Sequence, residues 1–254
     1  MAEHYIEFVG VTKAFGDHRV LDNVSFHVDQ GQTAVIMGRS GVGKSVSLKH
    51  IMGFLQPDDG RVLVAGNDIT DWPESKLAEI RKRVTMVFQS GALFDSLTVG
   101  ENIAFPLYER EGITDDEVDA RVHELADMLE VANDLDRVPS ELSTGAKRNI
   151  AIARALAQDP EAILYDEPTT MVDPLMATHT GDLILKLKEK FHKTSIVVTH
   201  DTHLARKLAD VVIFLQDGKV SFFGTWKDFE ASTDKFLRNF RMLDELIPQL
   251  DVTA

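Results

Sequence analysis

Residues 33–52 read TAVIMGRSGVGKSVSLKHIM, and this stretch decides the fold. Thr33–Met37 is an apolar run that predicts a buried strand, and Lys44–Met52 has the spacing of a helix. Between them, Gly38–Ser45 matches the pattern G-x4-G-K-[ST]. A glycine-rich loop at such a place lets backbone N–H groups surround phosphate oxygens, and the start of the helix adds partial positive charge. The stretch therefore predicts a phosphate-binding loop rather than an accidental glycine-rich turn.

Two side chains of this loop have predicted roles of their own. Lys44 would reach the β and γ phosphates of a nucleotide, and the Ser45 hydroxyl would bind Mg2+. Val46, the next residue, is assigned no role. The residues expected to contact the nucleotide here are Gly38, Arg39, Ser40, Gly41, Val42, Gly43, Lys44 and Ser45.

The composition excludes several classes of protein. The 254 residues include 41 acidic and 27 basic side chains, for a net charge of −14, which argues against nucleic acid as a partner. The absence of cysteine excludes disulfides, thiolate metal sites and thiol nucleophiles. The longest apolar run, Val211–Leu215, is far shorter than the ~20 residues of a membrane helix, and no secretory signal opens the sequence. We therefore expect a cytoplasmic protein.

Short apolar runs alternate with longer helical stretches, which predicts an α/β fold with a largely parallel sheet. Between Thr98 and Arg137 the strand signals stop, so a helical subdomain is expected at about 98–150. Strands are expected at 6–11, 24–28, 33–37, 61–65, 84–88, 162–165, 195–199, 211–215 and 219–223, and helices at 44–52, 75–83, 117–129, 144–158 and 177–191.

A second acidic element follows a predicted strand, where residues 162–167 read AILYDE. Asp166, at the carboxyl end of this strand, would hold Mg2+, and Glu167 would orient or deprotonate an attacking water. Two acids after a strand are usually part of a solvated loop. The phosphate loop earlier in the chain favours the catalytic interpretation.

Residues 142–146 read LSTGA and precede the helical run Ile150–Leu156. Here the chain resembles the nucleotide-binding domain of ABC (ATP-binding cassette) ATPases, whose signature reads LSGGQ, over roughly residues 5 to 230. Thr144 and Ala146 depart from that signature, which puts the turnover rate in doubt more than ATP binding. The resemblance implies further roles: adenine stacking for Phe15, Mg2+ contact for Gln89, the D-loop aspartate for Asp173, and the γ-phosphate histidine for His200.

The resemblance also implies an architecture and a mechanism. The expected fold is an ABC-type phosphate-loop core with an N-terminal antiparallel β subdomain and an inserted helical subdomain, over residues 1–231, followed by a tail at 232–254. Two copies would bind two ATP, with Ser143 and Gly145 of one copy facing the phosphate loop of the other. Glu167 would be the base, and Lys44 and His200 would bind the γ-phosphate.

Residues 88–107 are similar to the ATPases of the bacterial Mla/Mce lipid-transport class. That similarity implies a subunit on the inner face of the inner membrane that works with an integral membrane permease and an Mce-domain lipid-binding protein. The complex would move phospholipid and maintain the lipid asymmetry of the outer membrane. Ala92, Leu93 and Phe94 would line a groove for the permease, or would only be part of the subdomain core.

Two alternatives remain for the function and two for the tail. The chain could serve an importer of another small solute, or be an ABC ATPase without a transport role, in DNA handling, translation or assembly. Long insertions or a second cassette, typical of DNA and translation proteins, are absent from the sequence. In the tail, Phe236, Leu237, Phe240, Leu243 and Leu246 predict an amphipathic helix over 234–246 that covers its own domain or reaches a neighbouring subunit.

Overall fold

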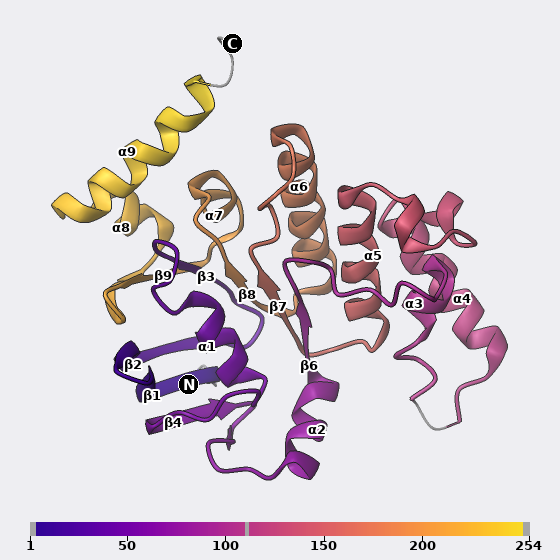
Figure 1. Cartoon of the computed structure of the whole chain (residues 1–254), viewed down its shortest axis with the longest axis horizontal. Helices are drawn as coiled ribbons and strands as arrows, with labels where there is room; N and C mark the ends of the chain where they lie inside the picture. The colour runs from indigo at the N-terminus through magenta and orange to yellow at the C-terminus, as the bar shows by residue number, and fades with distance from the viewer. Residues whose placement is uncertain (1–3, 110–111, 251–254) are drawn as a thin grey trace. The chain divides into compact units, whose positions relative to one another are not determined.

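The computed structural model describes residues 4–109 and 112–250. The chain forms two units that interleave in sequence (Figure 1). Unit 1 comprises the residues up to Asp71 together with those from Ile196 onward, and unit 2 comprises Trp72–Ser195. Strand β8 (Thr194–Val198) contains the second boundary between them.

An antiparallel sheet opens unit 1, as the family resemblance implies. Its strands lie in the order β2 (His18–Asp29), β1 (His4–Phe15), β4 (Asp59–Val64) and β5 (Asn67–Asp68). Buried apolar residues alternate with more exposed ones along β2, because successive side chains point to opposite faces of a sheet. Opposite residues Phe8 and Phe26 stack with their ring centroids 4.4 Å apart, which joins β1 to β2.

A second group of strands in unit 1 leads into the phosphate loop. Strand β3 (Thr33–Met37) is buried at every position and runs parallel to β9 (Val211–Gln216), which pairs antiparallel with β10 (Lys219–Gly224). A strand buried on both faces needs a continuous apolar run, which is why the prediction for 33–37 is confirmed at both ends. Helices α1 (Lys44–Ile51), α7 (Thr202–Leu208) and α8 (Trp226–Ala231) complete this group.

The tail forms helix α9 (Lys235–Leu250), and its described side chains cover unit 1 itself. The rings of Phe236 and Phe240 meet the edge of Phe214 on β9 at centroid distances of 6.0 and 4.9 Å, and Leu237 is buried. Arg241 donates hydrogen bonds to the carbonyls of Phe229 and Ser232. The first half of α9 therefore follows the first of the two expectations for the tail. Leu243 and Leu246 lie outside the described side chains.

Unit 2 combines a parallel strand pair with a helical region. Strands β6 (Val84–Val87) and β7 (Ala162–Asp166) pair in parallel, and the stretch from 98 to 157 forms helices and turns without a strand among its described residues. Helices α3 (Val99–Ala104) and α4 (Asp115–Met128) each begin with a capping box, in which a threonine and a glutamate three positions on satisfy each other's backbone N–H groups. The helices are α2 (Glu74–Arg83), α3 (Val99–Ala104), α4 (Asp115–Met128), α5 (Thr144–Ala157) and α6 (Pro174–Phe191).

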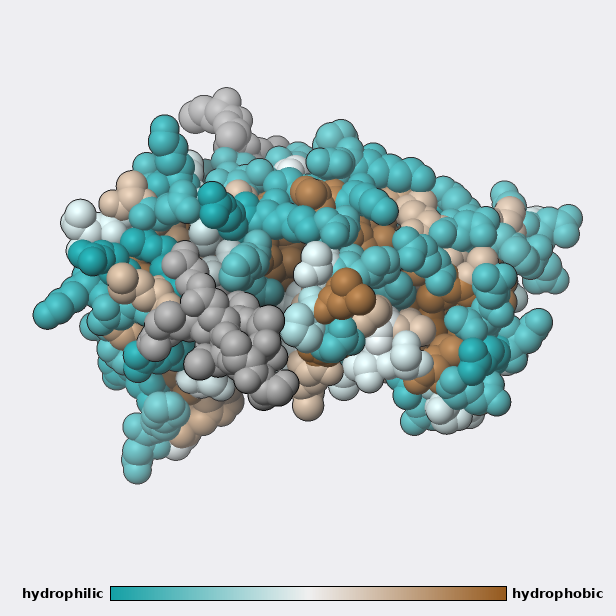
Figure 2. Space-filling view, turned by 90° about the horizontal axis from the view of Figure 1, so that it is seen from above, coloured by the Kyte–Doolittle hydropathy of each residue, from teal (hydrophilic) through white to brown (hydrophobic). Residues whose placement is uncertain are grey.

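The face seen in Figure 2 is mainly hydrophilic, with apolar areas among the hydrophilic residues. Among the described residues, no helix combines the length and the apolar character that a membrane span needs. The predicted fold class, an α/β phosphate-loop core with an antiparallel sheet near its start and inserted helices, is confirmed.

Candidate active site

The phosphate loop of unit 1 closes around the side chain of Lys44. The ammonium Nζ donates to the carbonyl oxygens of Gly38 at 2.9 Å and Arg39 at 3.1 Å, and the residue is only 6% exposed. Two glycines make this curl possible. A Cβ at Gly38 would lie 2.4 Å from the carbonyl oxygen of Leu215, and Gly43 has a φ of 104° in the left-handed region.

The start of α1, which follows the phosphate loop, is suited to bind an anion. Its N-cap residue is Gly43, which has no side chain to cap the helix, and the first turn has no acidic residue. The first N–H groups of a helix and its dipole attract negative charge, so the geometry matches the phosphate-binding role predicted for 38–45.

Phe15 and His200 also belong to unit 1. Phe15 ends β1 with 47% of its surface exposed, so its ring is accessible for stacking. The Lys13 ammonium lies over the same ring, 5.8 Å from its centroid. His200 is exposed and lies two residues after the end of β8. The N–H of the preceding Thr199 donates to the carbonyl of Ile36 at 3.1 Å, which ties this turn to the strand that enters the phosphate loop.

Unit 2 contains the two acids at the end of β7. Asp166 is the last residue of the strand, and both it and Glu167 are half-buried. Glu167 has a φ of 49°, an uncommon left-handed conformation for a residue with a side chain. The Thr170 hydroxyl donates to Glu167 Oε2 at 2.9 Å, and the Thr170 N–H donates to the Glu167 carbonyl at 3.2 Å. The carboxylate is thus held by its own turn in one orientation, as a general base requires.

The signature residues lie at the start of α5. Ser143 is the N-cap, and its Oγ accepts a hydrogen bond from the Ala146 N–H at 3.2 Å. Gly145 is buried, and a Cβ there would lie 2.3 Å from Met176 Cε, so a larger residue would have to displace that methionine. Thr144 is exposed. Asp173 caps α6 in the same way, accepting from the Met176 N–H at 3.0 Å.

The predicted residues therefore divide between the two units. Unit 1 holds the phosphate loop, Phe15 and His200, whereas the remaining site residues belong to unit 2. These are Gln89, Ser143, Gly145, Asp166, Glu167 and Asp173.

Arg148, to which the sequence analysis gave no role, connects three segments of unit 2. Its guanidinium donates to the carbonyl of Pro168, to that of Gln89 at 3.0 Å and to that of Thr170 at 3.1 Å. The residue is 3% exposed, and burial lowers the pKa of the guanidinium. The exposed Gln89 side chain adds a weak contact, with Nε2 3.7 Å from Met171 Sδ. A single cation thus fixes the signature helix, the Gln89 segment and the turn that carries Glu167.

We expect Arg148→Met to reduce the rate of ATP hydrolysis roughly tenfold, which corresponds to ~1.4 kcal/mol, with a smaller effect on ATP affinity. The reason is that two carbonyls of the Glu167 turn, those of Pro168 and Thr170, lose their guanidinium donor, while the phosphate loop in unit 1 is unchanged. Arg154→Met is the matched control, because Arg154 is also partly buried on α5 but donates to the carbonyls of Gly91 and Ala92 instead. Phosphate release and ATP titration measure both variants, and equal losses in the two would mean that Arg148 acts only on stability.

The comparisons with known proteins agree with this geometry. The family model of the ABC transporter matches residues 21–170, from within β2 to the turn that carries Glu167. An Intermembrane phospholipid transport system ATP-binding protein MlaF from Haemophilus influenzae is 38% identical over 92% of this chain and 89% of its own. A Probable ribonucleotide transport ATP-binding protein mkl from Mycobacterium leprae is 34% identical over 92% of this chain and 68% of its own.

A solved structure shares the fold. It is the dimeric post-hydrolysis state of the ATP-binding cassette MJ0796 bound to ADP and Pi, with 33% identity, a TM-score of 0.79, and coverage of 87% of this chain and 98% of that one. The family match over residues 21–170 includes both the phosphate loop and the two acids at the end of β7. The chain belongs to the ABC transporter family and is the subunit of such a transporter that binds and hydrolyses ATP.

Proposed function

We propose that this ATPase drives a complex that moves phospholipid between membranes. The observation that carries the proposal is the 38% identity to the Haemophilus influenzae phospholipid-transport protein over 92% of the chain. The 34% identity to a protein named for ribonucleotide transport supports a second candidate, a transporter of another small molecule. The test must therefore identify the transported molecule as well as the partners.

The chemistry of the proposed site follows from its donors. Lys44 and the N–H groups of the phosphate loop bind the phosphates of ATP, and Phe15 stacks on the adenine. Oxygen atoms of Ser45, Asp166 and Gln89 would hold Mg2+, and the bound ion would neutralise charge on the phosphates. Glu167 takes a proton from the attacking water, and His200 binds the γ-phosphate.

The proposed active unit is a homodimer. Ser143 and Gly145 of one copy contact the γ-phosphate on the other, and Asp173 lies at the contact between them. The dimeric state of the solved cassette, at 33% identity, supports this assembly. So does the exposure of Met171 and Leu175, 81% and 79%, beside Asp173, because large apolar side chains so exposed are typical of an interface.

The proposed permease contact is the apolar surface of the helical region in unit 2. Phe94, Phe105 and Tyr108 are 42%, 44% and 63% exposed, and the rings of Phe94 and Phe105 meet with centroids 4.6 Å apart. A cavity of about 950 Å³ extends from Leu97 past Phe105 to residues of α4. Such a groove fits a short amphipathic helix of a membrane partner.

Two side chains fix the loop that borders this surface. Asn102 binds the N–H and the carbonyl of Phe94 at 2.9 and 3.1 Å, and the Arg154 guanidinium lies 5.6 Å from the centroid of the Phe94 ring. Arg154 also donates to the Gly91 and Ala92 carbonyls. The loop is held from both ends, so Leu93, which is half-buried, and Phe94 are presented in one arrangement.

We expect Leu93→Asp to abolish copurification of the permease while ATP binding is unchanged. A carboxylate in an apolar contact is left without a partner, whereas the phosphate loop lies in unit 1. Ser96→Asp is the matched control, because it adds the same charge to the same loop at an exposed polar position. Recovery of an intact complex with Leu93→Asp would contradict the assignment of the groove.

Purification of the native complex from membranes tests the transported molecule. We expect the tagged chain to recover a second copy of itself, an integral membrane permease and an Mce-domain protein on the inner membrane, and mass spectrometry to find bound phospholipid. Recovery of a binding protein for sugars or amino acids instead would reject phospholipid transport and leave the ATPase assignment intact.

A further inference from the structure

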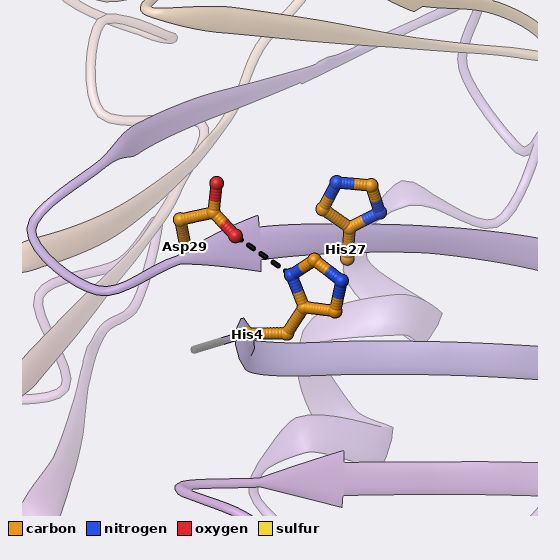
Figure 3. Close-up of side chains that lie close together, drawn as sticks. All are labelled: His4, His27 and Asp29. Carbon is orange, nitrogen blue, oxygen red and sulfur yellow. Dashed lines mark hydrogen bonds and ion pairs between the residues drawn. The ribbon is translucent and has the colours of Figure 1, made fainter. Parts of the chain in front are cut away.

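Two histidines and an aspartate meet on one face of the antiparallel sheet of unit 1, apart from every residue assigned above (Figure 3). His27 and Asp29 are two positions apart on β2, so their side chains point to the same face. His4, at the start of β1, is paired directly with Asp29. Directly opposite residues of an antiparallel pair share a face, which brings all three together.

The donor atoms of the cluster lie close together. His4 Nδ1 lies 2.7 Å from Asp29 Oδ1, and one ligand atom from each of the three residues lies within 4.8 Å of the others. The rings of His4 and His27 stack with centroids 4.0 Å apart. The His27 ring also makes a T-shaped contact with the Phe223 ring, with centroids 5.0 Å apart.

From this geometry we propose that His4, His27 and Asp29 form a binding site for a divalent transition-metal ion, with Zn2+ as the favoured ion. Two imidazole nitrogens and one carboxylate oxygen are a usual Zn2+ ligand set, with metal–ligand distances of about 2.0–2.2 Å. Side-chain rotations at the three positions close the remaining gap. Imidazole ligands favour Zn2+ over Mg2+ and Ca2+, which prefer oxygen.

The exposure of the cluster fits an ion with an open coordination position. The side chains of His4 and Asp29 are 40% and 32% exposed, so an ion reaches them from solvent and water completes the coordination. The ion would join β1 to β2 at the start of the chain. Binding to the folded state alone would then stabilise the sheet by an amount that rises with the logarithm of the free metal concentration once that exceeds the dissociation constant.

The competing explanation is an ordinary histidine–carboxylate pair with a stacked ring beside it. The described chain contains such pairs elsewhere: His123 Nδ1 lies 3.3 Å from Asp119 Oδ1, and His179 Nε2 lies 3.0 Å from Glu130 Oε2. Neither pair belongs to a group of three ligands close enough for a metal among the described residues. These two pairs therefore serve as internal controls for the proposed metal site.

The test is calorimetric titration of the full chain with Zn2+ in the absence of nucleotide. We expect one Zn2+ per chain, with affinity at least about tenfold weaker in His27→Gln and in His4→Gln, an order of magnitude usual for a disrupted metal site. His123→Gln, which removes a histidine from an ordinary pair, should bind Zn2+ like the wild type. ATP titration confirms that each variant is folded.

A second readout reports on the coordination itself. With Co2+ in place of Zn2+, the wild type should show the absorption bands of a four-coordinate ion, and Asp29→Asn should weaken or shift them. Absence of saturable Zn2+ binding would overturn the proposal. So would retention of wild-type affinity by His27→Gln, or an equal loss of affinity in His123→Gln.

Discussion

Replacing Glu167 with glutamine is expected to reduce ATP turnover by at least about a hundredfold, the lower end of what a general base contributes, while ATP still binds. The substitution keeps the size of the side chain and an oxygen that can accept the hydrogen bond from Thr170, 2.9 Å away in the wild type. What it removes is the ability to take a proton from water. Phosphate release measures turnover, and ATP titration measures binding.

The control for this variant lies at the other end of the same strand. Glu161, just before β7, is an exposed carboxylate whose Oε1 lies 2.7 Å from Arg83 Nε. Glu161→Gln should hydrolyse ATP at the wild-type rate, because an exposed ion pair contributes little. Full hydrolysis by Glu167→Gln would remove Glu167 from the catalytic role.

Lys44→Ala is expected to weaken ATP binding by at least about a hundredfold, or ~2.7 kcal/mol. Lys44 is the buried cation of the phosphate loop, and its Nζ holds the Gly38 and Arg39 carbonyls at 2.9 and 3.1 Å. Alanine removes the charge that neutralises the phosphates, which weakens ATP binding. It also removes the contacts to these two carbonyls, so the loop is no longer held in its binding conformation.

Lys49→Ala is the matched control, because Lys49 is an exposed lysine in the last turn of the same helix. Titration with ATP, together with thermal unfolding to confirm the fold, compares the two. An unchanged dissociation constant in Lys44→Ala would show that the phosphate loop does not bind the nucleotide as described.

The sequence predicted the elements whose burial is complete. Strand β3 was predicted at both ends, because a strand covered on both faces needs an unbroken apolar run. The short helices α3, α7 and α8 were not predicted, since six or seven residues are too few to show a helical period. Their N-cap residues Thr98, Asp201 and Thr225 were the available signal.

The candidate site was predictable where spacing alone defines it, and not where contacts cross the sequence. The motif around Lys44 and the strand that ends at Asp166 are continuous in sequence. Arg148 instead reaches carbonyls 20, 22 and 59 residues away, and hydrogen bonds to backbone carbonyls leave no mark on the residue types involved. The left-handed conformation of Glu167 is likewise set by the turn that follows it.

The most direct test of the central claim is transfer of labelled phospholipid by the reconstituted complex of this chain with the proposed permease and lipid-binding protein. We predict transfer, in either direction between vesicle membrane and lipid-binding protein, that requires ATP and stops when the chain carries Glu167→Gln. Phospholipid transfer that continues at the same rate without ATP, or with Glu167→Gln, would contradict the account.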